Sequence, residues 1–110
     1  MSKNLLSMHR HPPGIQAKEA LDAVLVAGVF DQQVSLLFRE EGVLQLTEVE
    51  AEMTEAVRSL PEYGIEAIYV CQNSLHANGV TSDDLLLPAQ ILTLAEQTEL
   101  ISGQDMVLSD

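Results

Sequence analysis

The feature that most constrains the fold is an alternation of short apolar runs with segments of helical spacing. Short runs rich in Leu, Ile and Val are typical of strands buried in a sheet. When such strands alternate with helices, they form a parallel sheet covered on both sides. We therefore predict a three-layer α/β fold with a mostly parallel, five-stranded sheet and helices on both faces. The predicted strands are residues 4–8, 34–38, 65–71, 85–87 and 105–109, and the predicted helices are residues 15–29, 47–60, 72–78 and 93–102.

Capping signals place several ends of these elements. Thr47 followed by Glu50, and Thr93 followed by Glu96, match the capping box that opens a helix. Gly79 and Gly103 are predicted to close the third and fourth helices. Residues 30–33 are predicted to connect the first helix to the second strand. Residues 43–46 fit either a turn of helix or an apolar loop.

The size and composition of the chain favour one domain over residues 1–110 and a cytoplasmic location. The apolar run 23–29 is far shorter than the roughly 20 residues that a membrane-spanning helix needs. No basic segment precedes a hydrophobic stretch, so no signal peptide is predicted. A single cysteine cannot form an internal disulfide, which agrees with a reducing compartment.

The charge balance argues against direct contact with nucleic acid or an anionic membrane surface. The formal net charge is −12, with 17 acidic residues against 5 basic ones, and the basic residues are scattered along the sequence. Proteins that grip phosphates need clustered Lys and Arg. If the chain serves an RNA pathway, we expect another protein to hold the RNA.

The run 23–29 predicts a covered helix. It contains no polar side chain, whereas a helix on the surface of a monomer keeps a wet face. This half of the helix must therefore be covered either by its own domain or by another subunit.

Cys71 is the main candidate for chemistry. It ends a predicted buried strand and precedes a short helix, the position where ligands collect in open α/β sheets. A helix amino terminus favours the thiolate, which could carry sulfur as a persulfide; alternatively, the thiol is a small buried apolar group. His76, in the same helix, is a candidate proton partner. No Cys-x-x-Cys motif is present, and no Arg or Lys follows Cys71, which disfavours an independent sulfurtransferase.

Other chemistries find little support. His9, His11 and His76 with Cys71 match no zinc-binding spacing, so neither a metal site nor a cofactor is predicted. Pro12-Pro13-Gly14 is neither a dinucleotide-binding nor a Walker motif. The positions that a phospho-receiver domain fills with acidic residues and a lysine hold other residues here.

Four segments together resemble the DsrE/DsrF-like family, and within it the DsrF-type subunits, the group that includes TusC. These segments are residues 20–25 in the first helix, Leu-Phe-Arg-Glu-Glu-Gly-Val-Leu-Gln-Leu at 37–46, Tyr-Val-Cys-Gln-Asn-Ser-Leu-His-Ala-Asn-Gly-Val at 69–80 and the closing residues 105–109. The resemblance covers nearly the whole chain and implies a flavodoxin-like α/β domain.

The resemblance also implies a function. It implies a cytoplasmic complex with TusB-like and TusD-like paralogues, which passes persulfide sulfur between proteins and on through a TusE-like acceptor for 2-thiolation of the tRNA wobble uridine. The sulfur-carrying cysteine is attributed chiefly to the D-type subunit, so this chain is expected to be an accessory or structural subunit rather than an enzyme. The alternatives are a DsrF-like subunit in sulfur oxidation and an independent thiol protein that carries persulfide on Cys71, with His76 as its proton partner.

Overall fold

The computed structural model describes residues 3–29 and 33–109, with the side chains of α1 described only as far as Val26. Five strands form one sheet in the order β4-β3-β2-β1-β5, and every strand pair is parallel. The predicted α/β architecture is confirmed. The strand order, which the sequence left open, differs from the 2-1-3-4-5 order of flavodoxin itself. The strands are β1 (Asn4–His9), β2 (Gln33–Phe38), β3 (Ala67–Cys71), β4 (Gln90–Leu92) and β5 (Met106–Ser109); the α-helices are α1 (Ile15–Val29), α2 (Ala51–Arg58), α3 (Gln72–Ala77) and α4 (Leu94–Ser102).

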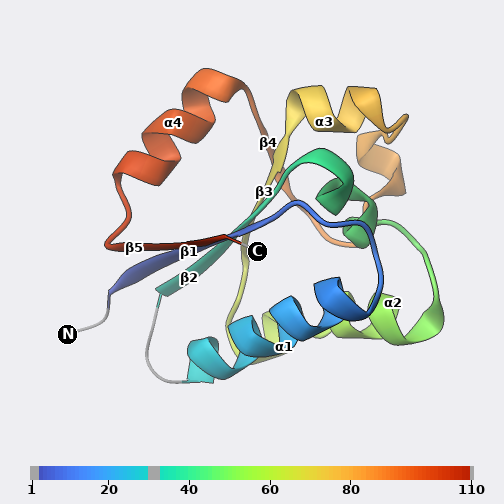
Figure 1. Ribbon diagram of the computed structural model, residues 1–110, viewed down its shortest axis with the longest axis horizontal. Coiled ribbons are helices and arrows are strands. Elements are labelled where there is room, and N and C mark those ends of the chain that lie inside the picture. The colour runs from blue at the N-terminus through green and yellow to red at the C-terminus, as the bar shows by residue number, and fades with distance from the viewer. Residues whose placement is uncertain (1–2, 30–32, 110) are drawn as a thin grey trace.

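The helices divide between the two sides of the sheet (Figure 1). Helices α1 and α2 lie together on one side, α4 lies on the other, and α3 stands beyond the carboxyl ends of the strands. Three short 3₁₀ helices complete the chain: η1 (Glu40–Leu46), η2 (Leu60–Tyr63) and η3 (Ser82–Asp84). Helix η1 packs against both α2 and α3.

The main core lies between the sheet and the pair α1 and α2. Alternate residues of the inner strands point into it because successive side chains of a strand face opposite ways. Leu21 and Val24 of α1 and Met53 and Val57 of α2 are the helical partners, three or four residues apart on each helix. The strand residues of this core are Leu5, Val34, Leu36, Phe38, Ile68 and Val70.

The second helix starts later than predicted. Thr47 does not open a helix; it ends η1, and its hydroxyl donates to the Leu44 carbonyl at 2.7 Å. Glu50 is the N-cap of α2, and its carboxylate accepts from the backbone N–H of Met53 at 2.6 Å and of Glu52 at 3.1 Å. The prediction failed because residues 43–46, which fitted either helix or loop, form the end of η1. Thr47 caps that 3₁₀ helix and therefore does not open α2.

The fourth strand is also displaced from its prediction. Residues 85–87 are half-buried against the main core without forming a strand, and the Leu86 N–H donates to the Leu46 carbonyl at 2.7 Å. The strand is Gln90–Leu92, beyond Pro88. Proline has no N–H to give to a sheet, so pairing with β3 begins only after it.

The predicted start and end of the fourth helix agree with the structure, whereas the second helix ends at Arg58 rather than Leu60, and Asn78 rather than Gly79 is the C-cap of the third. Thr93 and Glu96 form both hydrogen bonds of the capping box of α4, and Gly103 is its C-cap. Gly79 follows α3 with φ of 66°, a conformation that glycine adopts without strain. The predicted connection at 30–33 falls mostly on residues 30–32, outside the described residues. No helix in the described parts of the chain is long and apolar enough to cross a membrane.

Gly42 fixes η1 against the first strand. A Cβ built at this position would lie 2.1 Å from the carbonyl oxygen of His9 and 3.0 Å from the Cα of Arg10. Only glycine permits this approach. The end of β1 and the segment after β2 are therefore held together next to the end of β3.

Candidate functional site

Cys71 is the last residue of β3, and α3 begins at the next residue. Its strand neighbour Val70 points into the main core, so Cys71 points to the opposite side of the sheet, where α4 lies. The side chain is 4% exposed and forms no disulfide. The predicted position of the thiol, between a strand end and a helix start, is confirmed.

The surroundings of Cys71 favour the thiolate. Burial raises the pKa of the thiol, but hydrogen bonds from the Ser74 hydroxyl, the Gln97 side chain and the backbone N–H groups of Ser74 and Asn73 lower it, and the net pKa lies below its usual value. Hydrogen bonds to the charged form of a group stabilise that form. The thiolate is the nucleophilic form of cysteine, so these contacts favour the form of the sulfur that can react.

The Ser74 hydroxyl is oriented by the segment that follows β2. Its oxygen accepts from the backbone N–H of Glu40 at 2.7 Å, which leaves the hydroxyl hydrogen to donate to Cys71. Glu40 has a positive φ of 51°, uncommon for a residue with a side chain. The Asn78 amide fixes the same contact by donating to the carbonyls of Glu40 at 3.1 Å and Ser74 at 2.8 Å.

Gln97 comes from α4, on the other side of the thiol. It is 2% exposed and is the only buried residue of α4. Its Nε2 donates to the Leu92 carbonyl at 3.2 Å, and the side chain also hydrogen-bonds the Cys71 thiol. Its Oε1 has no hydrogen-bond partner among the described residues. Buried polar atoms are normally paired; the Oε1 atoms of Gln45 and Gln104 are open in the same way, but only that of Gln97 belongs to a side chain that contacts the thiol.

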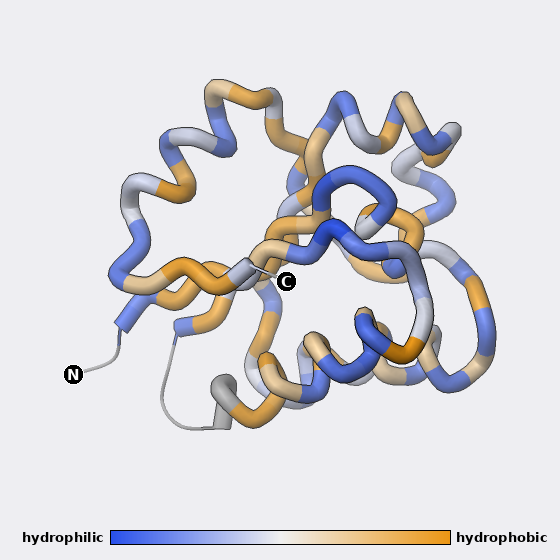
Figure 2. Tube along the Cα trace, in the orientation of Figure 1, coloured by the Kyte–Doolittle hydropathy of each residue, from blue (hydrophilic) through white to orange (hydrophobic). Residues whose placement is uncertain are grey.

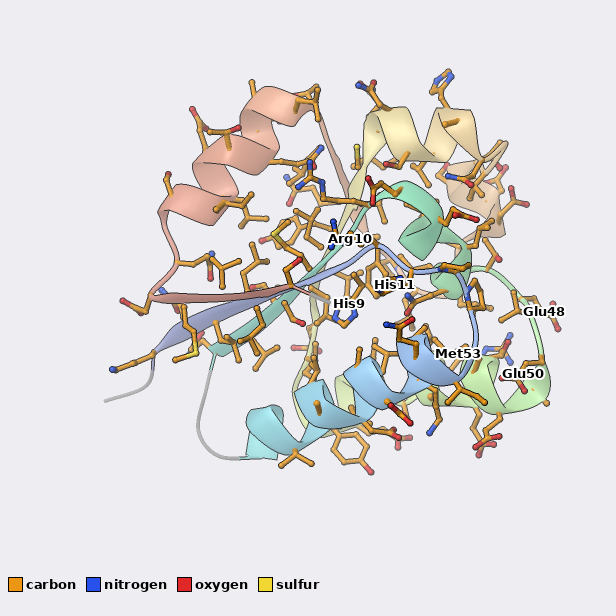
Figure 3. The ribbon with its side chains drawn as sticks, in the orientation of Figure 1. His9, Arg10, His11, Glu48, Glu50 and Met53 are labelled. Carbon is orange, nitrogen blue, oxygen red and sulfur yellow. The ribbon has the colours of Figure 1, made fainter. Side chains whose placement is uncertain are left out.

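Two arginines lie in the same row as the thiol, that is, at the same level across adjacent strands of the sheet. Phe38 pairs with Val70 and His9 pairs with Phe38, so the next residues along these strands, Arg39 and Arg10, continue the row from Cys71. Arg39 keeps an extended backbone, with φ −131° and ψ 163°, which puts its side chain on the same face as Cys71. Figure 3 shows Arg10 on the side of α3 and α4 and His9 on the side of α1.

The histidines are not gathered at the thiol. His9 is buried, stacks on Phe38 with ring centroids 5.2 Å apart and has its Nε2 2.9 Å from the Ser7 hydroxyl. His76 is exposed on α3 and is not among the groups that hydrogen-bond the thiol, so its role as a proton partner stays a prediction. The described residues contain no group of three or more His, Cys, Asp or Glu arranged to hold a metal.

Sequence reasoning missed the residues that the fold brings toward Cys71 from elsewhere in the chain. It searched for basic residues only after Cys71, although the strand order places Arg39 at the same level on the adjacent strand and Arg10 one strand further away. The signal was present, because Phe38-Arg39 ends one predicted strand as Val70-Cys71 ends the next. Gln97 left only a weak signal: it is a polar residue three positions from each of the apolar residues Leu94 and Leu100 on the predicted helix.

These features define a class: a five-stranded parallel α/β domain with one thiol at the carboxyl edge of an inner strand. The DsrE/DsrF-like family model matches residues 3–109, and the chain belongs to that family.

Two relatives agree with this assignment, and a solved structure shares the fold. The chain is 30% identical to a TusC homologue of Pseudomonas aeruginosa, with 99% of each chain covered. It is 32% identical to the intracellular sulfur oxidation protein DsrF of Allochromatium vinosum, with 97% of this chain and 96% of the relative covered. The crystal structure of YchN from E. coli is similar over the full length of both chains, with a TM-score of 0.81 at 15% identity. This last similarity concerns the fold alone.

Proposed function

We propose that this chain is the DsrF-type subunit of a cytoplasmic sulfur-relay complex, an accessory subunit that works with TusB-like and TusD-like paralogues. The complex passes persulfide sulfur between proteins, on through a TusE-like acceptor, for 2-thiolation of the tRNA wobble uridine. Full-length similarity to a TusC homologue supports this proposal. The observation that carries it is the apolar surface that the chain leaves uncovered.

That surface lies on α1 and β5. Val26 of α1 is 58% exposed, so the chain itself does not cover the outer side of its apolar helix. Of the two alternatives for this helix, cover by a second subunit is the one that remains. Met106, Val107 and Leu108 of the edge strand β5 are 52%, 40% and 47% exposed. The apolar character of β5 is visible in Figure 2. Exposed apolar side chains that gather along one element, as on β5, are typical of protein interfaces.

The charge supports a relay between proteins rather than contact with tRNA. A net charge of −12 repels a nucleic acid backbone. The tRNA would therefore be held by the enzyme that receives the sulfur.

Two observations favour a second candidate function, in which Cys71 itself carries the persulfide. The thiol has a lowered pKa, and hydrogen-bond donors surround it. A role in sulfur oxidation is the pathway alternative, because the DsrF relative is as similar to the chain as the TusC homologue is.

Co-expression with the two paralogues tests the complex. The wild-type chain is expected to co-purify with both, whereas Val26→Lys and Leu108→Lys lose the partners while remaining folded by circular dichroism. Thr98→Lys, on the exposed side of α4, is the matched control and retains them. A wild-type chain that remains a stable monomer in the presence of both paralogues contradicts the proposal.

A deletion strain separates the pathways. Loss of 2-thiouridine from tRNA, restored by the wild-type gene, supports the tRNA role. Intact 2-thiouridine together with impaired oxidation of intracellular sulfur supports the DsrF-like alternative.

A further inference from the structure

The row of residues at the carboxyl edge of the sheet contains Arg39, a cation for which no role has been given above. Arg39 is the next residue in register after Phe38, as Cys71 is after Val70, so the two are neighbours on adjacent strands and on one face. Backbones of adjacent strands lie about 4.8 Å apart, within reach of an arginine side chain. Among the described residues, no hydrogen bond or ion pair engages the Arg39 guanidinium.

Gln97 supplies an independent sign of a ligand at the same place. The side chain is 2% exposed and contacts the thiol, and its Oε1 lacks a partner among the described residues. A buried carbonyl oxygen without a donor is costly. A group with a hydrogen to donate, bound on or beside Cys71, would satisfy it.

We propose that Cys71, Gln97 and Arg39 form a persulfide-binding site, in which Gln97 holds the inner sulfur and Arg39 binds the negatively charged outer sulfur. The site deepens the second candidate function, because it rests on sulfur being carried by Cys71. Arg39 is a binding residue, and Arg10, next in the row, adds positive charge behind it. The ligand is the outer (sulfane) sulfur of a persulfide, and a hydropersulfide delivers it.

The transfer step balances without an oxidant. The Cys71 thiolate attacks the outer sulfur of a donor R–S–SH; a new S–S bond forms, and the donor S–S bond breaks. The donor leaves as R–S⁻ with the electron pair, and the proton stays on the transferred sulfur, now Cys71–S–SH. That S–H can donate to the open Oε1 of Gln97. After the proton leaves, the outer sulfur is an anion that Arg39 can pair with.

Opposing charges at this edge are exposed. Glu40 and Glu41 follow Arg39 in the sequence, and Glu96 lies in the first turn of α4; all three are solvent-exposed. Water and salt screen exposed carboxylates strongly. Arg39 is only partly exposed, so its charge acts on the buried sulfur with less screening.

Two alkylating reagents of similar size and different charge test the site on the full-length chain. Iodoacetate is an anion and iodoacetamide is neutral, and both lose iodide to the Cys71 thiolate. In Arg39→Gln, we expect the iodoacetate rate to fall about fivefold while the iodoacetamide rate is unchanged. A fivefold change is the effect expected from removing one unit charge about 4 Å away in a dielectric like that of water. Arg58→Gln, which removes a charge from α2 on the other side of the sheet, is the matched control with an unchanged ratio. Arg39→Lys restores the wild-type ratio in part.

The second readout is sulfur itself. After incubation with glutathione persulfide, intact mass is expected to show one added sulfur atom on the wild-type chain, none on Cys71→Ser, and about fivefold less on Arg39→Gln than on Arg58→Gln. An unchanged reagent ratio in Arg39→Gln overturns the proposal. So does a wild-type thiol that accepts no sulfur, or one that reacts with neither reagent until the chain is denatured. Failure to co-purify with the paralogues would overturn the complex and leave this site standing.

Discussion

The two sides of the sheet differ in how completely they are closed. On the side of α1 and α2, the side chains that form the core between these helices and the inner strands are almost entirely buried. On the other side, α4 buries a single residue, the polar Gln97, and its Leu94 is 52% exposed. The thiol faces this second, open side.

The difference separates stability from chemistry. The closed side contains the apolar area whose burial stabilises the fold. The open side has polar groups around Cys71, an unpartnered carbonyl oxygen on Gln97 and a helix with few contacts. Elements with few buried contacts open most easily, so α4 is suited to admit a partner to the thiol while the closed side stays intact.

The largest expected effect is a loss of stability on the closed side. Leu36 is fully buried in β2, and Leu36→Ala is expected to lower the free energy of unfolding by about 2–5 kcal/mol because a cavity replaces its side chain. Leu94→Ala, a matched change on the exposed side of α4, is expected to cost less than about 0.5 kcal/mol. Urea unfolding followed by circular dichroism measures both. Equal losses would show that the two sides contribute alike.

The second effect tests the junction between the two sides. Gly42→Ala places a Cβ against the His9 carbonyl and is expected to cost about 1–3 kcal/mol, since backbone must move. Gly103→Ala is the control: its φ is −87° and a Cβ there meets only ordinary contacts at 3.7 and 3.8 Å. A Gly42→Ala chain as stable as Gly103→Ala in the same urea experiment would argue against a rigid η1.

Much of the fold could be predicted because local patterns and the final packing agree. The helical spacing of Leu21 and Val24 and the capping pair Thr93 and Glu96 appear in the structure as predicted. The errors fall where tertiary contacts override a local signal. Thr47 caps a 3₁₀ helix that the sequence did not resolve, and residues 85–87 pack on the core without pairing.

The site was less predictable than the fold, because its parts come from four separate segments. Cys71 and its strand–helix setting follow from local sequence. Ser74 is local too, but its orientation depends on the Glu40 N–H, across a positive φ that no pattern predicts. Gln97 reaches the thiol only through the crossing of α4, and Arg39 lies on the strand next to Cys71 only through the strand order; periodicity determines neither.

A smaller effect concerns the reactivity of the thiol. Ser74→Ala removes a hydrogen bond to the thiolate and is expected to raise the pKa of Cys71. The iodoacetamide rate, measured across pH, would then rise only at higher pH than in the wild type. Asn73→Ala is the matched control, because Asn73 contacts the sulfur through its backbone N–H, which the substitution keeps. A shift of equal size in both variants would mean that the Ser74 hydroxyl has no specific part.

The smallest expected effect is the coupling of that thiol to folding. The folded pKa of Cys71 lies below the value of 9.0 for an unperturbed thiol. The stabilisation is therefore fully present above pH 9.0 and is lost as the pH falls through the folded pKa. The free energy of unfolding of the wild type, minus that of Cys71→Ala, should rise across this window. The rise is small because burial opposes the hydrogen bonds that lower the pKa.

Subtracting the free energies of unfolding of the two chains cancels the contributions of groups that both chains share. The rise should shrink in a Ser74→Ala background. A difference that falls with pH would mean that the thiol is held neutral, and the open side of the sheet would then lack the charge that distinguishes it from the closed one.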